Sequence, residues 1–154
     1  MKAAAVTLWF GDEINEAAAW YLESIPGTTC SSNVDKTRKG HVGQTVHLVL
    51  PGGMHLTLLN GGSLMEKNHS VSIVLTCVDQ AEIDQLWDDL SADGGKPGQC
   101  GWLVDKFGFH WQVIPDTLPE IMSGPNAAKV MAALLTMTKL DIAQLRAAGE
   151  DVEA

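Results

Sequence analysis

The sequence predicts an α+β fold in which one strand, one helix and a group of strands occur twice, followed by a helical tail. Three observations support this prediction. Short apolar runs precede segments with helical periodicity, hairpin signals lie in both halves, and two helices superpose at one offset. The offset of 67 residues relates Asp12 to Asp79 and Trp20 to Trp87, which indicates duplication of a module.

The first module begins with a strand and a helix. Residues 3–10, "AAAVTLWF", form a short apolar run that is typical of a buried strand. Asp12 is expected to cap the helix that follows, because its carboxylate can accept from free backbone N–H groups. Apolar residues recur at helical spacing through residues 14–25, and Pro26-Gly27 ends the helix.

Three strands complete the first module, which we place at residues 1–62. A weak extended segment covers residues 28–34. The segments "GQTVHLVL" and "MHLTLLN" then flank Pro51-Gly52-Gly53, which predicts a β-hairpin. A turn on Gly52-Gly53 would place His47 on the face of Leu56, Leu58 and Asn60.

The second module, residues 68–116, repeats this order. "HSVSIVLTC" predicts a strand, and Asp79 with Glu82 predicts a capping box at the start of a helix. Gly94-Gly95 stops that helix, and "GQCGWLVDKFGFHWQVIP" supplies the last hairpin. Little room remains for the extra strand of a full copy, so the second module is expected to be trimmed.

The turn "DKFG" sets the register of the last hairpin. Asp105 suits the first position of a type I turn in solvent, and Gly108 suits a left-handed residue after it. Trp102 then lies across from Gln112, with His110 on the same face. The opposite face would hold Leu103, Phe109, Trp111 and Val113 as core. With a two-residue loop, Trp102 would instead face Trp111.

The helical tail covers residues 117–154. Pro125 lies near the start of one helix with an apolar face, and Asp141 can cap a last short helix. The apolar face is expected to cover the domain or a second subunit. The positions that form it are Ala127, Val130, Met131, Leu134, Leu135 and Thr138.

Length and composition limit the class of protein. The 154 residues suit a single domain with its own core. A net charge of −9, with ten basic residues that form no stripe, disfavours nucleic acid as a partner. Three cysteines without a CxxC pair suit a reducing compartment and mostly buried thiols. No run is long enough to span a membrane and no signal peptide is apparent, so we expect a cytoplasmic protein.

Four segments together resemble the PhnB-like branch of the vicinal oxygen chelate superfamily. They are "LWFGDEINEAAAWY", "LLNGG", "GQCGWLVDKFGFHWQVIP" and "KVMAALLTMTKLDIAQL". The resemblance covers nearly the whole chain. It implies paired βαβββ modules whose sheets curl into a cup, commonly as homodimers. Related families include glyoxalase I, extradiol dioxygenases, and bleomycin and fosfomycin resistance proteins.

Proteins of this branch often carry the label 3-demethylubiquinone-9 3-methyltransferase-like. A nucleotide cofactor would need a Gly-rich loop after a strand, with an acidic residue further on. The sequence contains no such pattern. We therefore expect no nucleotide cofactor.

The resemblance also implies positions for metal ligands, at the first and last strands of each module. The first strand offers no strong ligand at these positions. Asn60 ends the fourth strand, Ser70 with the out-of-phase His69 occupies the fifth, and Gln112 stands where relatives place a glutamate. Neutral amides bind transition metals weakly. We expect no metal site, and a divalent metal held by His47, His69 or His110 stays open as an alternative.

If the Gln112 face forms the cup interior, its residues predict a small-ligand site. Aromatic walls with a few directional polar groups are typical of such sites. Equally, the amides of Asn60 and Gln112 could bond to neighbouring backbone or to each other. The candidate ligand-binding residues are Asn60, Trp102, His110, Gln112, Trp9 and His47.

Three functional hypotheses follow. The leading one is a metal-independent protein that binds a small organic ligand, is expected to form a homodimer, and has an undefined catalytic status. The second is a metal-dependent isomerase, lyase or dioxygenase of the same fold with atypical histidine ligands. The third is a structural or regulatory dimer whose cup is filled by its own side chains.

Overall fold

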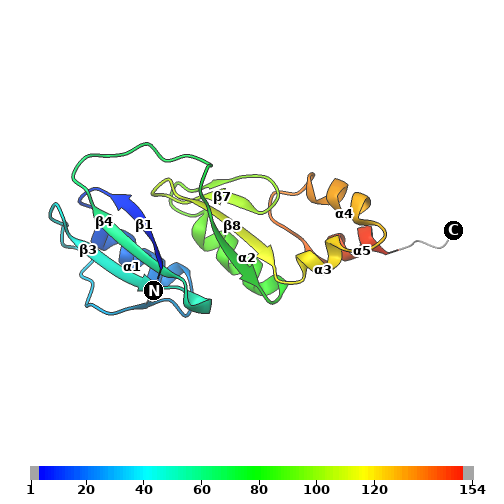
Figure 1. Cartoon of the computed structure of the whole chain (residues 1–154), viewed down its shortest axis with the longest axis horizontal. Helices are drawn as coiled ribbons and strands as arrows, with labels where there is room; N and C mark the ends of the chain where they lie inside the picture. Colours follow the sequence, from blue (N-terminus) through cyan, green and yellow to red (C-terminus); the bar gives the residue numbers. More distant parts are fainter. Residues whose placement is uncertain (1–3, 151–154) are drawn as a thin grey trace. The chain divides into compact units, whose positions relative to one another are not determined.

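The computed structural model describes residues 4–150 and divides into two compact units (Figure 1). The N-terminal unit comprises residues 1–66 and the C-terminal unit residues 67–154. Their boundary lies between the two predicted modules, and the tail belongs to the C-terminal unit. That the chain is one domain stays a prediction.

The N-terminal unit is a four-stranded sheet with one helix. The strand order is β1-β4-β3-β2, with β1 parallel to β4 and the other pairs antiparallel. This is the predicted strand, helix and three strands. The elements are β1 (Ala5–Phe10), α1 (Ile14–Ser24), β2 (Thr29–Cys30), β3 (Thr45–Val49), the 3-10 turn η1 (Pro51–Gly53) and β4 (His55–Asn60).

Alternation along the strands separates two faces of this sheet. The side chains of Leu56 and Leu58 on β4 are buried, and α1 contacts β3 and β4. His47 pairs with Thr57, so both point to the other face, which we call the His47 face. The expectation that His47 shares a face with Leu56, Leu58 and Asn60 is therefore wrong.

The start of α1 differs from the prediction. Glu13 occupies the N-cap position and makes no side-chain capping hydrogen bond. The Asp12 carboxylate instead pairs with the Lys39 ammonium group, and the Asp12 carbonyl accepts from the backbone N–H of Gly40. Asp12 therefore anchors the segment that follows β2 and does not cap the helix.

The C-terminal unit repeats the arrangement, with strand order β5-β8-β7-β6. The two-residue β6 corresponds to β2, so the expected loss of a strand is wrong. The second module is shorter because its connections are shorter. Its elements are β5 (Ile73–Cys77), α2 (Gln80–Leu90), β6 (Lys96–Pro97), β7 (Trp102–Val104) and β8 (His110–Pro115).

Asp79 caps α2 as predicted, since its carboxylate accepts from the backbone N–H of Glu82 at 2.9 Å. The return bond of the box is displaced by one residue. The Glu82 carboxylate accepts from the N–H of Val78, not from that of Asp79.

The predicted register of the last hairpin is confirmed. Trp102 pairs with Gln112 and Val104 with His110. Gly108 has a φ of 87°, and its N–H donates to the Asp105 carbonyl, as the left-handed position of the turn requires. The opposite face holds the buried Leu103, Trp111 and Val113, whereas Phe109 is only half-buried.

The tail forms α3 (Leu118–Met122), α4 (Ala127–Leu134) and α5 (Ile142–Gly149). Val130, Leu140 and Leu145 make a buried cluster of their own, and Ile114 of β8 packs against it. Asp141 caps α5 as predicted by accepting from the N–H of Gln144. The predicted apolar face of α4 is divided, because Val130 is buried while Met131 and Leu135 are exposed.

All three cysteines are free thiols, but only Cys77 is buried, which corrects the expectation of mostly buried thiols. Burial raises the pKa of the Cys77 thiol to about 12, with smaller contributions from the negative charges of Glu82, Asp79 and Asp116. Among the helices of residues 4–150, none has the length and apolar character needed to cross a bilayer.

Candidate functional site

The predicted residues of the C-terminal unit share one face of its sheet, which we call the Gln112 face. Register places Trp102 directly across from Gln112 on β7, and Val74 across from it on β5. His110 lies on the same face, two residues before Gln112. The structure thus brings Trp102, His110 and Gln112 together.

His110 is the most unusual group on the Gln112 face. Its side chain is 8% exposed, and its Nδ1 is buried without a hydrogen-bond partner among residues 4–150. A buried polar atom without a partner is costly and rare in native proteins. This nitrogen is therefore a candidate contact for a ligand atom.

The neighbours of His110 determine its charge. The ring of His69 lies against it, with centroids 4.1 Å apart and planes inclined by 53°. Burial, and next the charge of His69, lower the pKa of His110, while Asp105 acts in the opposite direction. His110 is accordingly neutral at pH 7, with one ring nitrogen able to accept a hydrogen bond.

Gln112 and Trp102 supply the other parts of the site. The Gln112 Nε2 donates to the Ser72 hydroxyl at 2.8 Å, and its Oε1 makes no hydrogen bond within residues 4–150. Trp102 is half-buried, and its ring meets that of His69 edge-on at a centroid distance of 6.4 Å. The Gln112 face thus combines an aromatic wall, an imidazole nitrogen and an amide oxygen.

Trp9 and His47, in the N-terminal unit, lie on the His47 face of the other sheet. Trp9 pairs with Leu59, two residues beyond Thr57 on β4. Its indole N–H donates to the Ser63 carbonyl at 2.6 Å, and its ring lies over Gly61, where a Cβ would approach within 1.8 Å. Trp9 is therefore held against its own backbone.

His47 is exposed, and its Nδ1 shares a hydrogen bond with the Thr57 hydroxyl at 3.1 Å. Such a local hydrogen bond is common for a histidine on a strand and does not by itself indicate a ligand site. A role of Trp9 or His47 in ligand binding stays a prediction.

Asn60 does not lie on the same face as these two residues. It is 2% exposed on the helix-covered side of the N-terminal sheet, the side of Leu56 and Leu58. Its Oδ1 accepts from the N–H of Gly62 at 2.9 Å, and its backbone N–H donates to the Gln44 carbonyl. The bond to Gly62 favours the alternative in which the side-chain amide serves neighbouring backbone. The register, which pairs Trp9 with Leu59, corrects the expected grouping of Asn60 with Trp9.

The metal that the fold family implies does not fit the donor set of this chain. Within residues 4–150, no three His, Cys, Asp or Glu side chains are grouped as metal ligands would be. His69 and His110 supply two imidazoles, and the neighbouring Gln112 supplies a neutral amide that binds divalent ions weakly. We therefore derive no chemistry through a metal.

Asp105 departs most from its predicted environment. It is 2% exposed instead of lying in solvent. Its Oδ1 accepts from the backbone N–H groups of Phe107 and Phe109, both at 2.9 Å, and its Oδ2 accepts from the Trp111 indole at 2.8 Å. The spacing of an Asp and a buried Trp across a tight turn could have indicated this bond.

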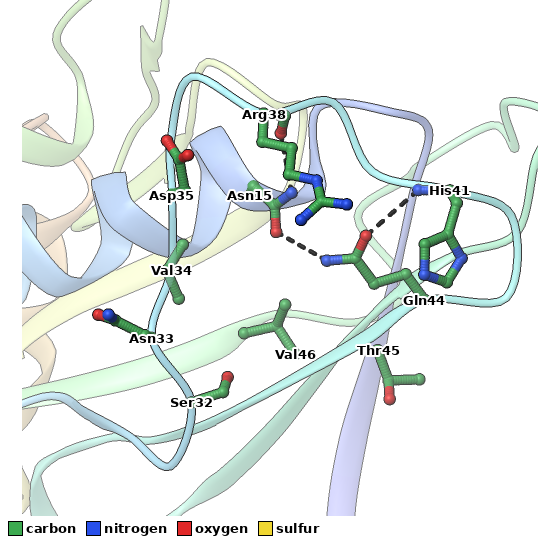
Figure 2. A pocket seen from close by; sticks show the side chains of 10 residues that line it. All are labelled: Asn15, Ser32, Asn33, Val34, Asp35, Arg38, His41, Gln44, Thr45 and Val46. Carbon is green, nitrogen blue, oxygen red and sulfur yellow. Dashed lines mark hydrogen bonds between the residues drawn. The ribbon is translucent and has the colours of Figure 1, made fainter.

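Sequence reasoning also missed a hollow of about 320 Å³ in the N-terminal unit (Figure 2). It lies between α1, the segment that follows β2, and the start of β3. Asn15, Arg38 and Gln44 supply its polar side. The basic run "KTRKG" at residues 36–40 was the one signal available, and it gives no indication of which elements close around it.

Comparison with known proteins identifies the relatives. A family model described as 3-demethylubiquinone-9 3-methyltransferase matches residues 2–114. None of the curated proteins matches the chain.

Solved structures show the same fold. A PhnB protein from Bacillus cereus is 22% identical with a TM-score of 0.57, over 73% of this chain and 99% of that one. A protein from Pseudomonas aeruginosa is 18% identical with a TM-score of 0.57, over 75% and 98% of the two chains. The fosfomycin resistance protein FosX from Mesorhizobium loti is 14% identical with a TM-score of 0.55, over 80% and 98%.

Proposed function

The chain belongs to the 3-demethylubiquinone-9 3-methyltransferase family, within the vicinal oxygen chelate fold, and from this premise we propose that it binds a compact, partly polar organic molecule. The Gln112 face is the proposed site. The observation that carries the proposal is the buried, unpartnered Nδ1 of His110 beside an amide and an indole.

The three side chains define what the ligand must offer. A hydroxyl or N–H group of the ligand donates to the neutral imidazole of His110, which removes the cost of the unpaired nitrogen. A second donor meets the free Oε1 of Gln112. The Trp102 ring packs against a flat or apolar part of the molecule. The ligand is therefore a small molecule with two hydrogen-bond donors on an apolar frame.

The proposed activity is binding without a bound divalent metal, because the donor set lacks the charge to hold one. Methyl transfer from a nucleotide cofactor is not part of the proposal, since the sequence lacks the Gly-rich loop that such a cofactor requires.

A variant pair tests the site. Gln112→Ala should keep the melting temperature close to that of the wild type and weaken binding of small amide-bearing or hydroxylated aromatic probes, such as 4-hydroxybenzamide. Thr57→Ala is the matched control, because Thr57 holds the register position on β4 that Gln112 holds on β8. Binding is measured by calorimetry and located by backbone amide NMR shifts.

Three results would contradict the proposal. One is equal loss of probe binding in both variants. Another is loss of folding in both Gln112→Ala and the milder Gln112→Glu, which would show a structural amide. The third is stoichiometric manganese, iron, nickel or zinc in the purified protein with a matching rise in melting temperature. That result would favour the metal-dependent enzyme, with His69 and His110 as its first candidate ligands.

The assembly and location belong to the same proposal. We propose a cytoplasmic homodimer, which the exposed Met131 on α4 and Leu135 at its C-cap, one turn further on, support as an apolar surface. Sedimentation equilibrium of the wild type and of Leu135→Lys checks the assembly, and a monomeric wild type would contradict it.

A further inference from the structure

We infer that the hollow in the N-terminal unit binds a compact aliphatic carboxylate, with the Arg38 guanidinium as its cationic contact. The hollow lies on the α1 side of the N-terminal sheet, since Val46, which lines it, faces the helix. It shares no residue with the Gln112 face. The inference therefore does not depend on the proposed function.

An amide relay gives the hollow a fixed wall (Figure 2). Asn15 of α1 is 7% exposed, and its Nδ2 donates to the backbone carbonyl of Arg38 at 2.8 Å. Its Oδ1 accepts from the Gln44 Nε2 at 2.7 Å, and the Gln44 Oε1 accepts from the His41 N–H at 3.2 Å. These bonds hold the backbone that carries Arg38, whereas the exposed guanidinium itself is not held by them.

Arg38 is the unpaired cation of its segment. Lys36 pairs with Glu23 at 3.1 Å, and Lys39 pairs with Asp12. The Arg38 guanidinium makes no hydrogen bond or ion pair within residues 4–150 and lies beside the amides of Asn15 and Gln44 (Figure 2). Its planar fork suits a carboxylate, which can accept two parallel hydrogen bonds.

The acidic residue at the rim is already engaged. The Asp35 Oδ1 accepts from the Thr37 hydroxyl at 2.7 Å and from the Thr37 backbone N–H at 3.0 Å. These two bonds lower the pKa of Asp35, and the charge of Arg38 adds a smaller effect. Asp35 therefore stays ionised, and its charge favours ligands with one carboxylate over those with several.

The apolar wall indicates an organic body. Val34 and Val46 line the side of the hollow away from the guanidinium (Figure 2). Val46 is only 3% exposed and already covered by protein, whereas Val34 is half-buried. An inorganic anion would leave Val34 in contact with water, whereas a short alkyl chain would cover it. The volume of about 320 Å³ lies at the small end of ligand pockets, so the chain is short.

Calorimetric titration of the full chain with butyrate, butyramide and inorganic phosphate tests the inference. Butyrate should bind, and butyramide and phosphate should bind about tenfold more weakly or not at all. NMR shifts should fall on residues 32–46 and leave residues 102–112 unchanged, which separates this site from the Gln112 face.

Arg38→Gln should weaken butyrate about tenfold, because it removes the charge-assisted hydrogen bonds. Lys36→Gln removes the same charge from a lysine that is already paired, and it should leave the affinity within about twofold. Equal losses in the two variants, tighter binding of phosphate than of butyrate, or no binding of any probe would each overturn the inference.

Discussion

The buried carboxylate of Asp105 makes the sharpest prediction for this fold. Asp105→Asn keeps one side-chain oxygen for the N–H groups of Phe107 and Phe109. It replaces the other oxygen by an NH₂ group that faces the Trp111 indole N–H, whose ring is 0% exposed. Two donors then meet where a donor met an acceptor.

The magnitude follows from the bond that is lost. A hydrogen bond to a charged group contributes about 1.5–3 kcal/mol, and a buried donor without an acceptor costs a similar amount. Asp105→Asn should therefore lower the free energy of unfolding by about 2 kcal/mol. Asp105→Ala removes the acceptors of all three named bonds and should lower it by roughly 4 kcal/mol.

A double-mutant cycle with Trp111→Phe isolates the indole bond, with urea unfolding followed by circular dichroism. Once the indole donor is removed, Asp105→Asn should cost less than about 1 kcal/mol, which gives a coupling energy near 1–2 kcal/mol. Asp89→Asn on α2 is the control, because this half-buried side chain makes no hydrogen bond or ion pair within residues 4–150, and it should stay within about 0.5 kcal/mol. An equal cost of Asp105→Asn with and without the indole would refute the reasoning.

Three further predictions concern other parts of the chain. The pKa of His110 is lowered from 6.5 in the folded protein, so as pH falls below 6.5 the unfolded chain takes up the proton first. The free energy of unfolding should therefore fall with pH in this range, more steeply in the wild type than in His110→Phe. Urea unfolding at several pH values would show the difference. With a pKa of about 12, the Cys77 thiol is about one part in ten thousand thiolate at pH 8, against about one part in ten at the ordinary pKa of 9.0. Iodoacetamide should therefore label Cys77 about 1000-fold more slowly in native than in urea-unfolded protein, as mass spectrometry would show. Gly61→Ala should lower stability by about 1–3 kcal/mol in thermal unfolding, since the added Cβ would lie 1.8 Å from the Trp9 ring. Gly124→Ala is the control and should be nearly neutral, because its added Cβ would lie 3.8 Å from the nearest atom. Equal costs would count against this placement of Trp9.

Local signals predicted the elements correctly where the governing interaction lies close in sequence. The last hairpin shows this best, because Asp105 and Gly108 determine the turn and the turn determines the register of Trp102 with Gln112. Asp79 and Asp141 cap their helices for the same reason, since a cap needs only the N–H three residues on.

The first hairpin shows how a local error changes a face. A turn on Gly52-Gly53 pairs His47 with Leu58, but the 3-10 turn Pro51–Gly53 pairs it with Thr57. A shift of one residue moves every side chain of a strand to the other side of the sheet. The grouping of Asn60 with His47 failed for this reason, although the elements themselves were correct. Trp9 is separated from Asn60 by another register, that of β1 with β4, which pairs Trp9 with Leu59.

Sequence patterns were enough to predict the family, the two repeated modules, the helical tail and the face shared by Trp102, His110 and Gln112. The burial of Asp105, the unpartnered nitrogen of His110 and the hollow beside Arg38 became visible only in the folded chain. The difference comes from distance along the chain. Periodicity and turn chemistry act within a few residues, whereas burial and pocket shape depend on segments such as Asn15, Arg38 and Gln44 that meet only in the folded protein.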